Sequence, residues 1–178
     1  MIFQWRSQAT TFPSVPTAEA ASAFVSTFLT DFSGVAESDR AAFISSVLDW
    51  RELAPIAVGP GWEQLSIEQR EAVLAAMTDH VAALVAELPL ASADLVITDT
   101  DPHDRGEFRV MTSALVDEEP TEITFWVFEE PDKGLRVGNI GVEGVSFLGR
   151  LRPQLTATMK SRGIDAAIRE LRGMVGKE

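Results

Sequence analysis

The chain has 178 residues, of which 46% are hydrophobic and 24% charged, and it contains no cysteine. A chain of this length suits one domain that buries about 70% of its unfolded surface, so neither a disulfide nor a metal is needed to hold a core. The net charge of −12 argues against nucleic acid as a partner and against permanent residence on an anionic membrane. The lack of cysteine excludes disulfides, thiolate metal sites and cysteine nucleophiles.

The two ends of the chain carry little information. No apolar run reaches the ~18 residues of a membrane span, and residues 1–6 lack the basic and apolar regions of a signal peptide. The sequence by itself therefore fits a cytoplasmic chain or a mature secreted one. We expect an N-terminal extension over residues 1–16, a single domain over 17–173 and a short tail over 174–178.

The first half of the chain has helical periodicity. Thr17 is predicted to cap a helix that ends at Gly34, and Ser38 to cap a second, shorter one. The clearest helix runs over 67–88, where Ser66 and Gln69 form a capping box at its start and Pro89 is predicted to stop it. Its apolar residues recur at intervals of three and four, which indicates one buried face: Val73, Leu74, Met77, Val81, Leu84, Val85 and Leu88.

The period then changes to that of strands, which we predict over 94–100, 107–116, 121–129 and 135–142. Short links at 101–102, 119–120 and 132–134 suit hairpin turns. Helical spacing returns at Phe147, with Pro153 a possible kink, and a last helix capped by Asp165 follows Gly163. The order predicts an α+β fold with a curved antiparallel sheet of about four strands, covered by helices on one face.

The strand-to-helix junction around Ser146 is the context of a serine-hydrolase nucleophile elbow. The motif fails because Leu148 stands where that elbow needs glycine. Only His80 and His103 are available as a base, and we expect His80 to lie off the apolar face of the long helix. Helix capping is therefore the better interpretation of Ser146. The chain also lacks the tyrosine that an oxyanion site of the ketosteroid type would use. We predict no catalytic residue.

Two further patterns resemble ligand sites. Gly138, Gly141 and Gly144 lack the spacing of a dinucleotide fingerprint, so strand kinking or a close approach to another group is the better interpretation. An acidic run lacks the length, central glycine and terminal glutamate of a calcium loop, so we expect a solvated turn and no metal site. Its members are Asp99, Asp101, His103 and Asp104.

The predicted sheet carries bulky apolar side chains on both faces around residues 125–128. From periodicity alone, this pattern fits either an ordinary core with a few exposed residues or the wall of a cavity.

A family resemblance bears on this choice. The C-terminal third resembles the end of MlaC (toluene-tolerance, auxiliary ABC-transport) proteins, in which a strand runs into an EGVS motif, a helix and a (K/R)xxGID motif. Residues 59–62 and 66–71 resemble the stretch that opens the family's long helix. The matching segments of the C-terminal third are Val142–Leu148, Arg152, Lys160–Asp165 and Leu171, and upstream Leu48-Asp49-Trp50 is similar to a further family motif.

The resemblance implies a cone-shaped fold with a deep apolar cavity that takes the acyl tails of a phospholipid and leaves the headgroup near solvent. It implies a periplasmic monomer with phospholipid as cargo and no cofactor. Its partners would be an inner-membrane ABC transporter with an MCE-domain ring and an outer-membrane lipoprotein–porin complex.

Eight residues are predicted to contact the tails. By position in the family motifs, Val85 and Val145 resemble tail-contacting sites. From the faces of the predicted elements, we add Met77, Val81, Phe125, Val127, Ile140 and Val142. Three other functions remain open: a carrier of a sterol-like or hopanoid lipid, a small-molecule enzyme on the same fold, and a protein-interaction module with a filled core.

Overall fold

The computed structural model describes residues 16–51, 53–88, 95–116, 118–130 and 132–174. Nearly all of the expected N-terminal extension and C-terminal tail, and the proline at 89 expected to stop the long helix, lie outside these residues. The division into an extension, a domain and a tail therefore remains a prediction.

The helical half begins with α1 (Ala18–Ser33), α2 (Arg40–Val47), α3 (Ala54–Val58) and α4 (Ile67–Glu87). Thr17 caps α1 by accepting the backbone N–H of Ala20, and the capping box of Ser66 and Gln69 opens α4, both as predicted. Ser38 does not cap α2: it lies in a 3₁₀ turn, Glu37–Asp39, and its hydroxyl hydrogen-bonds the Asp39 carboxylate instead.

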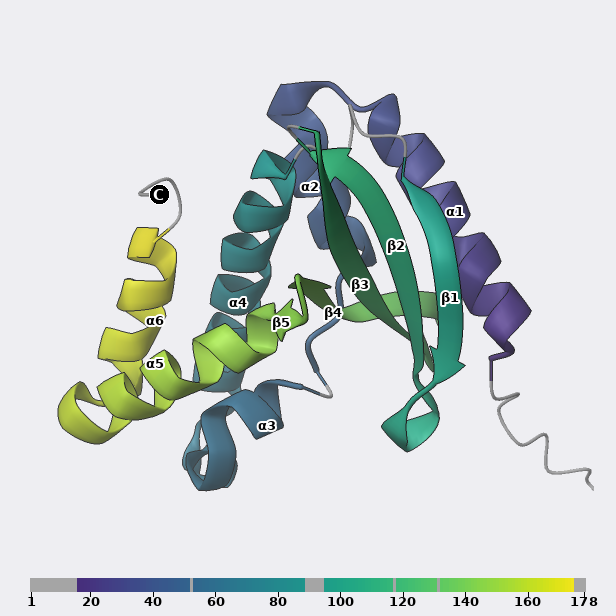
Figure 1. Ribbon diagram of the computed structural model, residues 1–178. Helices are drawn as coiled ribbons and strands as arrows, with labels where there is room; N and C mark the ends of the chain where they lie inside the picture. Colours follow the sequence, from purple (N-terminus) through teal and green to yellow (C-terminus); the bar gives the residue numbers. More distant parts are fainter. Residues whose placement is uncertain (1–15, 52, 89–94, 117, 131, 175–178) are drawn as a thin grey trace, which may run out of the picture.

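The sheet has strands β1 (Val96–Pro102), β2 (Phe108–Val116), β3 (Glu119–Glu130), β4 (Gly134–Val142) and β5 (Val145–Ser146). They lie in that order and each pairs antiparallel with the next, so the α+β class and the antiparallel sheet are confirmed. The described residues add a fifth strand to the four expected. Register shifts between Ile97 and Asp99, and between Trp126 and Val127, interrupt the ladder, and such bulges bend a sheet. Figure 1 shows the bent strands.

Two of the predicted turns belong to strands. Asp101 and Pro102 end β1, and the turn is formed by the residues after them. Pro120 pairs with Leu115 of β2, while the pairing of β3 with β4 begins only at Ile123. Proline is therefore tolerated at 120, because no neighbour on the β4 side needs its missing N–H.

Two helices close the chain, α5 (Phe147–Arg162) and α6 (Ile164–Met174). The helix α5 continues through Pro153, and Asp165 lies inside the first turn of α6 rather than before it. In Figure 1, α1 lies to the right of the sheet and α4, α5 and α6 lie to the left.

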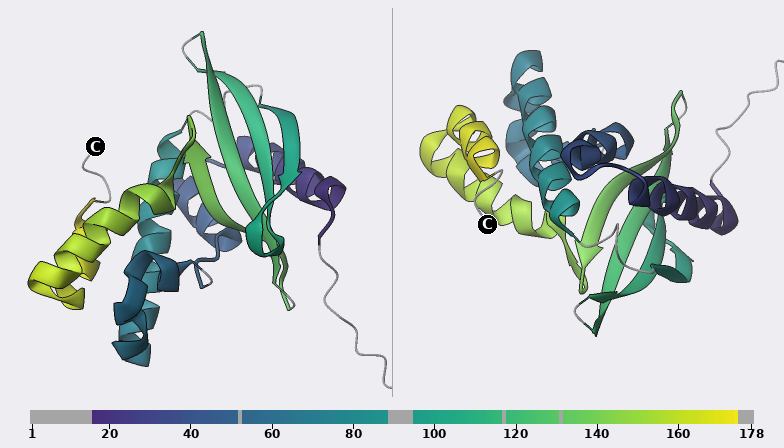
Figure 2. Two further views of the ribbon diagram at one scale, coloured as in Figure 1. Left: turned by 60° about the horizontal axis from the view of Figure 1, so that its bottom comes forward. Right: turned by 90° about the horizontal axis from the view of Figure 1, so that it is seen from above.

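The helices pack in a sequence of layers. The helix α1 packs against β1, β2 and β3, α4 packs against α2 and α6, and α5 packs against α3, α6 and β4. Seen from above, α4 lies between α2 and the α5–α6 pair (Figure 2, right). The two helices α4 and α5 are thus joined mainly through α6.

Candidate functional site

The inner face of the sheet and α4 supply one apolar interior. The side chains of Phe125, Val127 and Ile140 are fully buried. They alternate with Trp126 and Phe128, which lie on the other face of β3 and are only half-buried. The same contiguous apolar cluster includes three fully buried residues of α4: Met77, Val81 and Val85. Six of the eight predicted tail-contacting residues are therefore brought together in one core.

The other two predicted residues lie at its margin. Val142 is half-buried, and Val145 is 45% exposed. Val145 follows a two-residue turn in which Glu143 and Gly144 both have positive φ, at 51° and 73°, the pattern of a tight hairpin. Glu143 is fixed there because its carboxylate accepts the Glu122 N–H and its own N–H donates to the Glu122 carbonyl. Val145 therefore lies on the surface beside this turn.

Two polar side chains buried in the sheet, Thr112 and Asn139, are satisfied locally. The Thr112 hydroxyl donates to the Ile123 carbonyl at 2.8 Å. The Asn139 side chain accepts the N–H groups of Ile140 and Leu148, which ties β4 to the start of α5. Among the described residues, the buried polar side chains include no carboxylate, and an enzyme on this fold would need one with a raised pKa.

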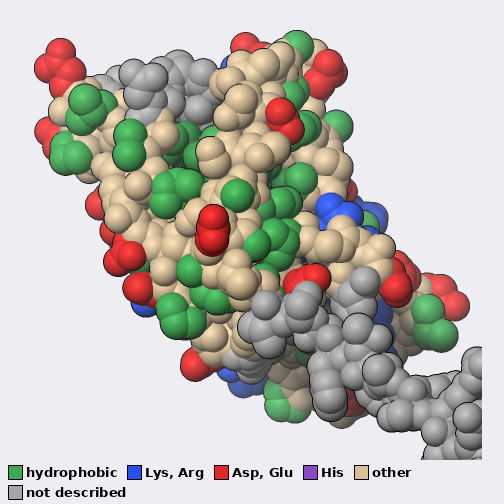
Figure 3. Space-filling view, turned by 90° about the vertical axis from the view of Figure 1, so that its right-hand side faces the viewer, with side chains coloured by type: hydrophobic (Ala, Val, Ile, Leu, Met, Phe, Trp, Pro, Cys, Tyr) green, Lys and Arg blue, Asp and Glu red, His purple; other side chains and the backbone are tan. Residues whose placement is uncertain are grey.

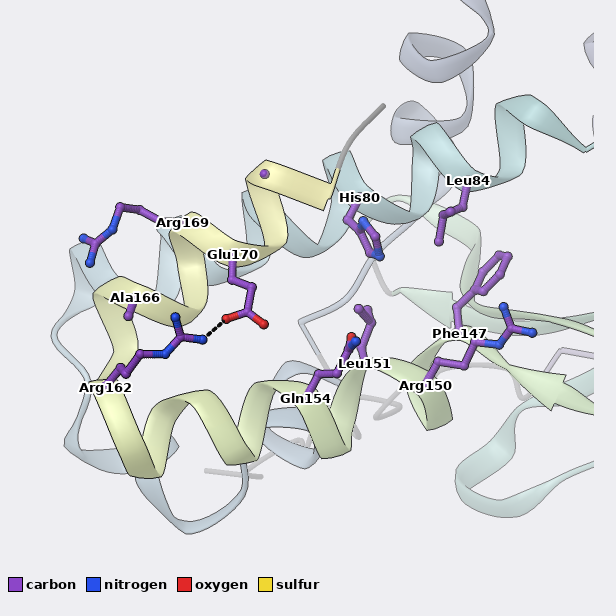
Figure 4. A pocket seen from close by; sticks show the side chains of 11 residues that line it. His80, Leu84, Phe147, Arg150, Leu151, Gln154, Arg162, Ala166, Arg169 and Glu170 are labelled. Atoms are coloured by element: carbon purple, nitrogen blue, oxygen red, sulfur yellow. Dashed lines mark hydrogen bonds and ion pairs between the residues drawn. The ribbon is translucent and has the colours of Figure 1, made fainter. Parts of the chain in front are cut away.

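A pocket of about 1150 Å³ lies elsewhere, between α4, α5 and α6. Figure 4 shows His80 and Leu84 reaching it from α4 and Phe147, Leu151 and Gln154 from α5. Its volume is somewhat larger than the range of about 300–1,000 Å³ that is usual for small-molecule sites. None of the eight predicted tail-contacting residues lines it.

The pocket and the apolar interior share a wall. Phe147 and Leu151 line the pocket and are also buried members of the apolar cluster. Leu84, which follows the turn of α4 that carries Val81, is half-buried and packs against the same cluster. The floor of the pocket is therefore the outer surface of the core, where α4 and α5 diverge.

Sequence reasoning missed this pocket and misplaced one of its residues. His80 was expected off the apolar face of its helix, but it is only 7% exposed and lines the pocket. The rest of the lining comes from three helices and combines apolar side chains with charged ones. Three arginines, Arg150, Arg162 and Arg169, contribute to it, and the excess of basic residues after Phe147 is the one sequence signal that could have indicated them.

The alternative chemistries weighed from the sequence find structural explanations. Ser146 caps α5, its hydroxyl accepting the Gly149 N–H at 3.0 Å. A Cβ on Gly138 would lie 3.1 Å from the Phe128 ring, and one on Gly141 would lie 3.1 Å from the Trp126 ring. These glycines are therefore required by the close approach of aromatic rings.

The acidic run was expected to form one turn, but Asp99 and Asp101 belong to strand β1, and only His103 and Asp104 follow it. The His103 N–H donates to the Glu107 carbonyl, and its ring lies edge-on to Trp126. Within the described residues, no group of three or more His, Cys, Asp or Glu side chains is placed to hold a metal ion. Nor does any described helix combine the length and apolar character needed to cross a bilayer.

The fold and this interior define an α+β protein in which a bent antiparallel sheet and a long helix enclose an apolar core. The family model for the MlaC protein matches residues 36–173, so the chain belongs to the MlaC family. The resemblance stated from the motifs is thereby confirmed.

A solved structure has the same fold. It is a phospholipid-binding protein from Ralstonia solanacearum, determined in complex with a phospholipid, and it aligns with a TM-score of 0.71 at 18% identity. The alignment covers 88% of this chain and 99% of that one. A search among curated proteins gave no match.

Proposed function

We propose that this protein is a soluble, non-enzymatic lipid carrier that holds the acyl tails of a phospholipid between the inner face of β3–β4 and α4. The observation that carries the proposal is the contiguous buried apolar cluster shared by these elements, whose outer wall at Phe147 and Leu151 is the floor of an open pocket. Membership of the MlaC family and the phospholipid complex of the Ralstonia protein support the choice of cargo.

The size of the hydrophobic effect favours an enclosed interior over a surface groove. Two acyl chains hold about 30 methylenes at ~0.8 kcal/mol each, on the order of 24 kcal/mol against water. A groove open to solvent would forfeit much of that. The pocket between α4, α5 and α6 carries arginines, a glutamate and a glutamine on its walls, so tails are better accommodated deeper, among the buried side chains of α4 and the sheet.

Six residues form the proposed walls, and they are supplied by three elements of the fold, the helix α4 and the strands β3 and β4. If the tails insert between α4 and the strands β3 and β4, contacts between apolar side chains are replaced by contacts between those side chains and the apolar tails. Loading from a bilayer is then close to neutral in free energy, because the tails leave one apolar environment for another. The direction of transport must come from the partners, and no chemical step is required.

The cellular role follows from the family. We propose that the carrier works in the periplasm as a monomer and shuttles phospholipid between an outer-membrane lipoprotein–porin complex and an inner-membrane MCE-domain ABC transporter. This traffic would maintain the lipid asymmetry of the outer membrane. The net charge of −12 fits a carrier that leaves anionic bilayers readily, and it disfavours nucleic acid as a partner.

The test of cargo is direct. Protein purified without added lipid is extracted with organic solvent, and the extract is analysed by mass spectrometry. Phospholipid near one molecule per chain is expected. A sterol-like or hopanoid molecule in its place would change the identity of the cargo, and an extract with only traces of lipid would contradict the proposal.

Substitutions test the location of the tails. Val85→Glu places a charge in the fully buried wall, and Val145→Glu places one at the exposed margin; both are expected to abolish lipid retention. Ile67→Glu, on the same helix as Val85 but 75% exposed, is the matched control and should retain lipid. Circular dichroism and gel filtration establish whether each variant is a folded monomer. Lipid retention equal to wild type in folded Val85→Glu would refute the location.

A further inference from the structure

The helices that border the pocket have a charge opposite to that of the chain. Residues 147–174 contain six Lys or Arg against two Asp or Glu, a net charge of +4 in a chain whose total is −12. The face over α1 and β1, in contrast, carries many acidic and few basic side chains (Figure 3). Basic residues are therefore concentrated on α5 and α6, and three of them line one pocket.

Two of the three arginines have charges that are not compensated. Arg162 forms an ion pair with Glu170, and both hydrogen-bond the Thr158 hydroxyl, so this end of the pocket is close to neutral (Figure 4). Arg150 on α5 and Arg169 on α6 make no ion pair with a described residue, and both are exposed. Figure 4 places them at opposite ends of the pocket, Arg150 beside Phe147 and Arg169 near Ala166, so the lining holds two separate cationic groups that can each bind an anion.

The rest of the lining selects the kind of anion. Leu84, Phe147 and Leu151 form an apolar floor continuous with the core, which a small inorganic ion would leave uncovered. Guanidinium groups bind phosphate oxygens through paired, charge-assisted hydrogen bonds. A cationic rim above an apolar floor is complementary to an amphiphile that joins a phosphate to acyl tails.

We propose that the pocket between α4, α5 and α6 binds the headgroup phosphate of an anionic phospholipid, and that Arg150 and Arg169 select a net-negative headgroup over a zwitterionic one. This rests on the proposed function, since the tails are assigned to the adjoining core. A zwitterionic headgroup carries an ammonium that a neighbouring unpaired arginine repels, whereas a phosphatidylglycerol headgroup does not.

The test uses the full chain, freed of lipid and incubated with vesicles of equimolar phosphatidylglycerol and phosphatidylethanolamine. After the vesicles are removed, mass spectrometry gives the ratio of the two lipids on the protein. Wild type should show a preference of roughly fivefold for phosphatidylglycerol, from one exposed charge contact with the headgroup. The double variant R150Q/R169Q should carry the same total lipid at a ratio of about one. The double variant R152Q/R172Q removes the same charge from exposed positions of α5 and α6 outside the pocket, and it should keep the wild-type ratio.

Three outcomes of the vesicle experiment overturn the inference while leaving the proposed function intact. They are lipid uptake by wild type with no preference, an unchanged ratio in R150Q/R169Q, and an equal loss of preference in R152Q/R172Q. The last would show a general attraction of the basic helices to an anionic membrane. Inorganic phosphate that binds lipid-free protein as tightly as phosphatidylglycerol, measured by calorimetry, would also overturn it, because the pocket would then be a free-ion site. If the wild-type protein takes up no lipid at all, the proposed function is contradicted as well.

Discussion

The ring of Phe28 on α1 meets the ring of Phe125 on β3 edge-on, with centroids 5.7 Å apart and planes at 66°. Phe28 also stacks on Phe43 of α2, at 5.7 Å. One aromatic side chain thus joins the first two helices to the inner face of the sheet. This contact fixes the helical layer opposite the strands that form the proposed tail-binding wall.

The first prediction concerns this contact. Phe28→Ala and Phe125→Ala should each lower the free energy of unfolding by about 3–5 kcal/mol, because both side chains are buried in a packed core. The double variant should show a coupling of about 0.5–1.5 kcal/mol beyond additivity, the value of an edge-to-face pair. Urea denaturation measures all four proteins. Strict additivity would mean that the two rings do not interact.

A second prediction separates a true helix cap from an apparent one. Ser66→Ala should lower the free energy of unfolding by about 1 kcal/mol, because the Ser66 hydroxyl accepts the Gln69 N–H at the start of α4. Ser38→Ala should change stability by less than ~0.5 kcal/mol, because Ser38 is exposed and caps no helix. Chemical denaturation measures the free energy of unfolding of both variants. A larger loss of stability in Ser38→Ala than in Ser66→Ala would contradict this assignment of the helix caps.

A third prediction concerns the outer face of the sheet. Gly141→Ala places a methyl group 3.1 Å from the Trp126 ring and 3.3 Å from the Val145 carbonyl oxygen. The ring or the strand must shift, at a cost of about 1–3 kcal/mol. Gly34→Ala is the control, because its new Cβ makes only an ordinary contact at 3.5 Å. Thermal unfolding that ranks Gly34→Ala as the more damaging of the two would contradict the packing described.

The fourth prediction follows from the charges at Asp49. Its backbone N–H donates to the Val137 carbonyl, and its carboxylate lies 3.4 Å from the Lys133 amine and 3.6 Å from the Arg51 guanidinium. Burial alone would raise the pKa of Asp49. The Arg51 N–H, a hydrogen bond with Glu130 and the charges of Arg51 and Lys133 outweigh burial and hold that pKa below 3.8.

A carboxyl with a lowered pKa in the folded state stabilises the fold above its unfolded pKa and loses that effect as pH falls. Wild type should therefore exceed Asp49→Asn in stability at neutral pH, and the difference should shrink as pH falls below about 3.8. Denaturation at a series of pH values measures it. A difference that stays constant down to the most acidic condition would show that Asp49 acts only through its shape.

The elements that could be predicted from sequence are those with local causes. Thr17 and the pair Ser66 and Gln69 cap their helices because the donors they satisfy are three residues away. The strands β2 and β3 follow the alternation of their residues. The two-residue strand β5 is too short to show a periodic pattern in the sequence. Pro120 is tolerated in β3 because the pairing of β3 with β4 begins only after it, and this pairing cannot be predicted from local sequence.

The site was predicted only in part, for a related reason. Periodicity identifies the buried face of α4 and of β3, so Val81, Val85 and Phe125 were recognised as interior. The pocket is assembled from residues on three helices whose packing angles no local pattern encodes. Arg150 and Arg169 lie on two different helices, where each would be interpreted as an ordinary solvent-exposed residue. Only the fold places them around one pocket.

The most direct test of the central claim is where the tails lie. A phospholipid with a photoreactive diazirine near the end of its acyl chains is loaded onto the protein and irradiated, and the cross-linked peptides are identified by mass spectrometry. Cross-links within Ile67–Glu87 of α4 and Glu119–Val142 of β3 and β4 are expected. Cross-links confined to α5 and α6 would contradict the account, because the tails would then lie in the open pocket rather than in the interior.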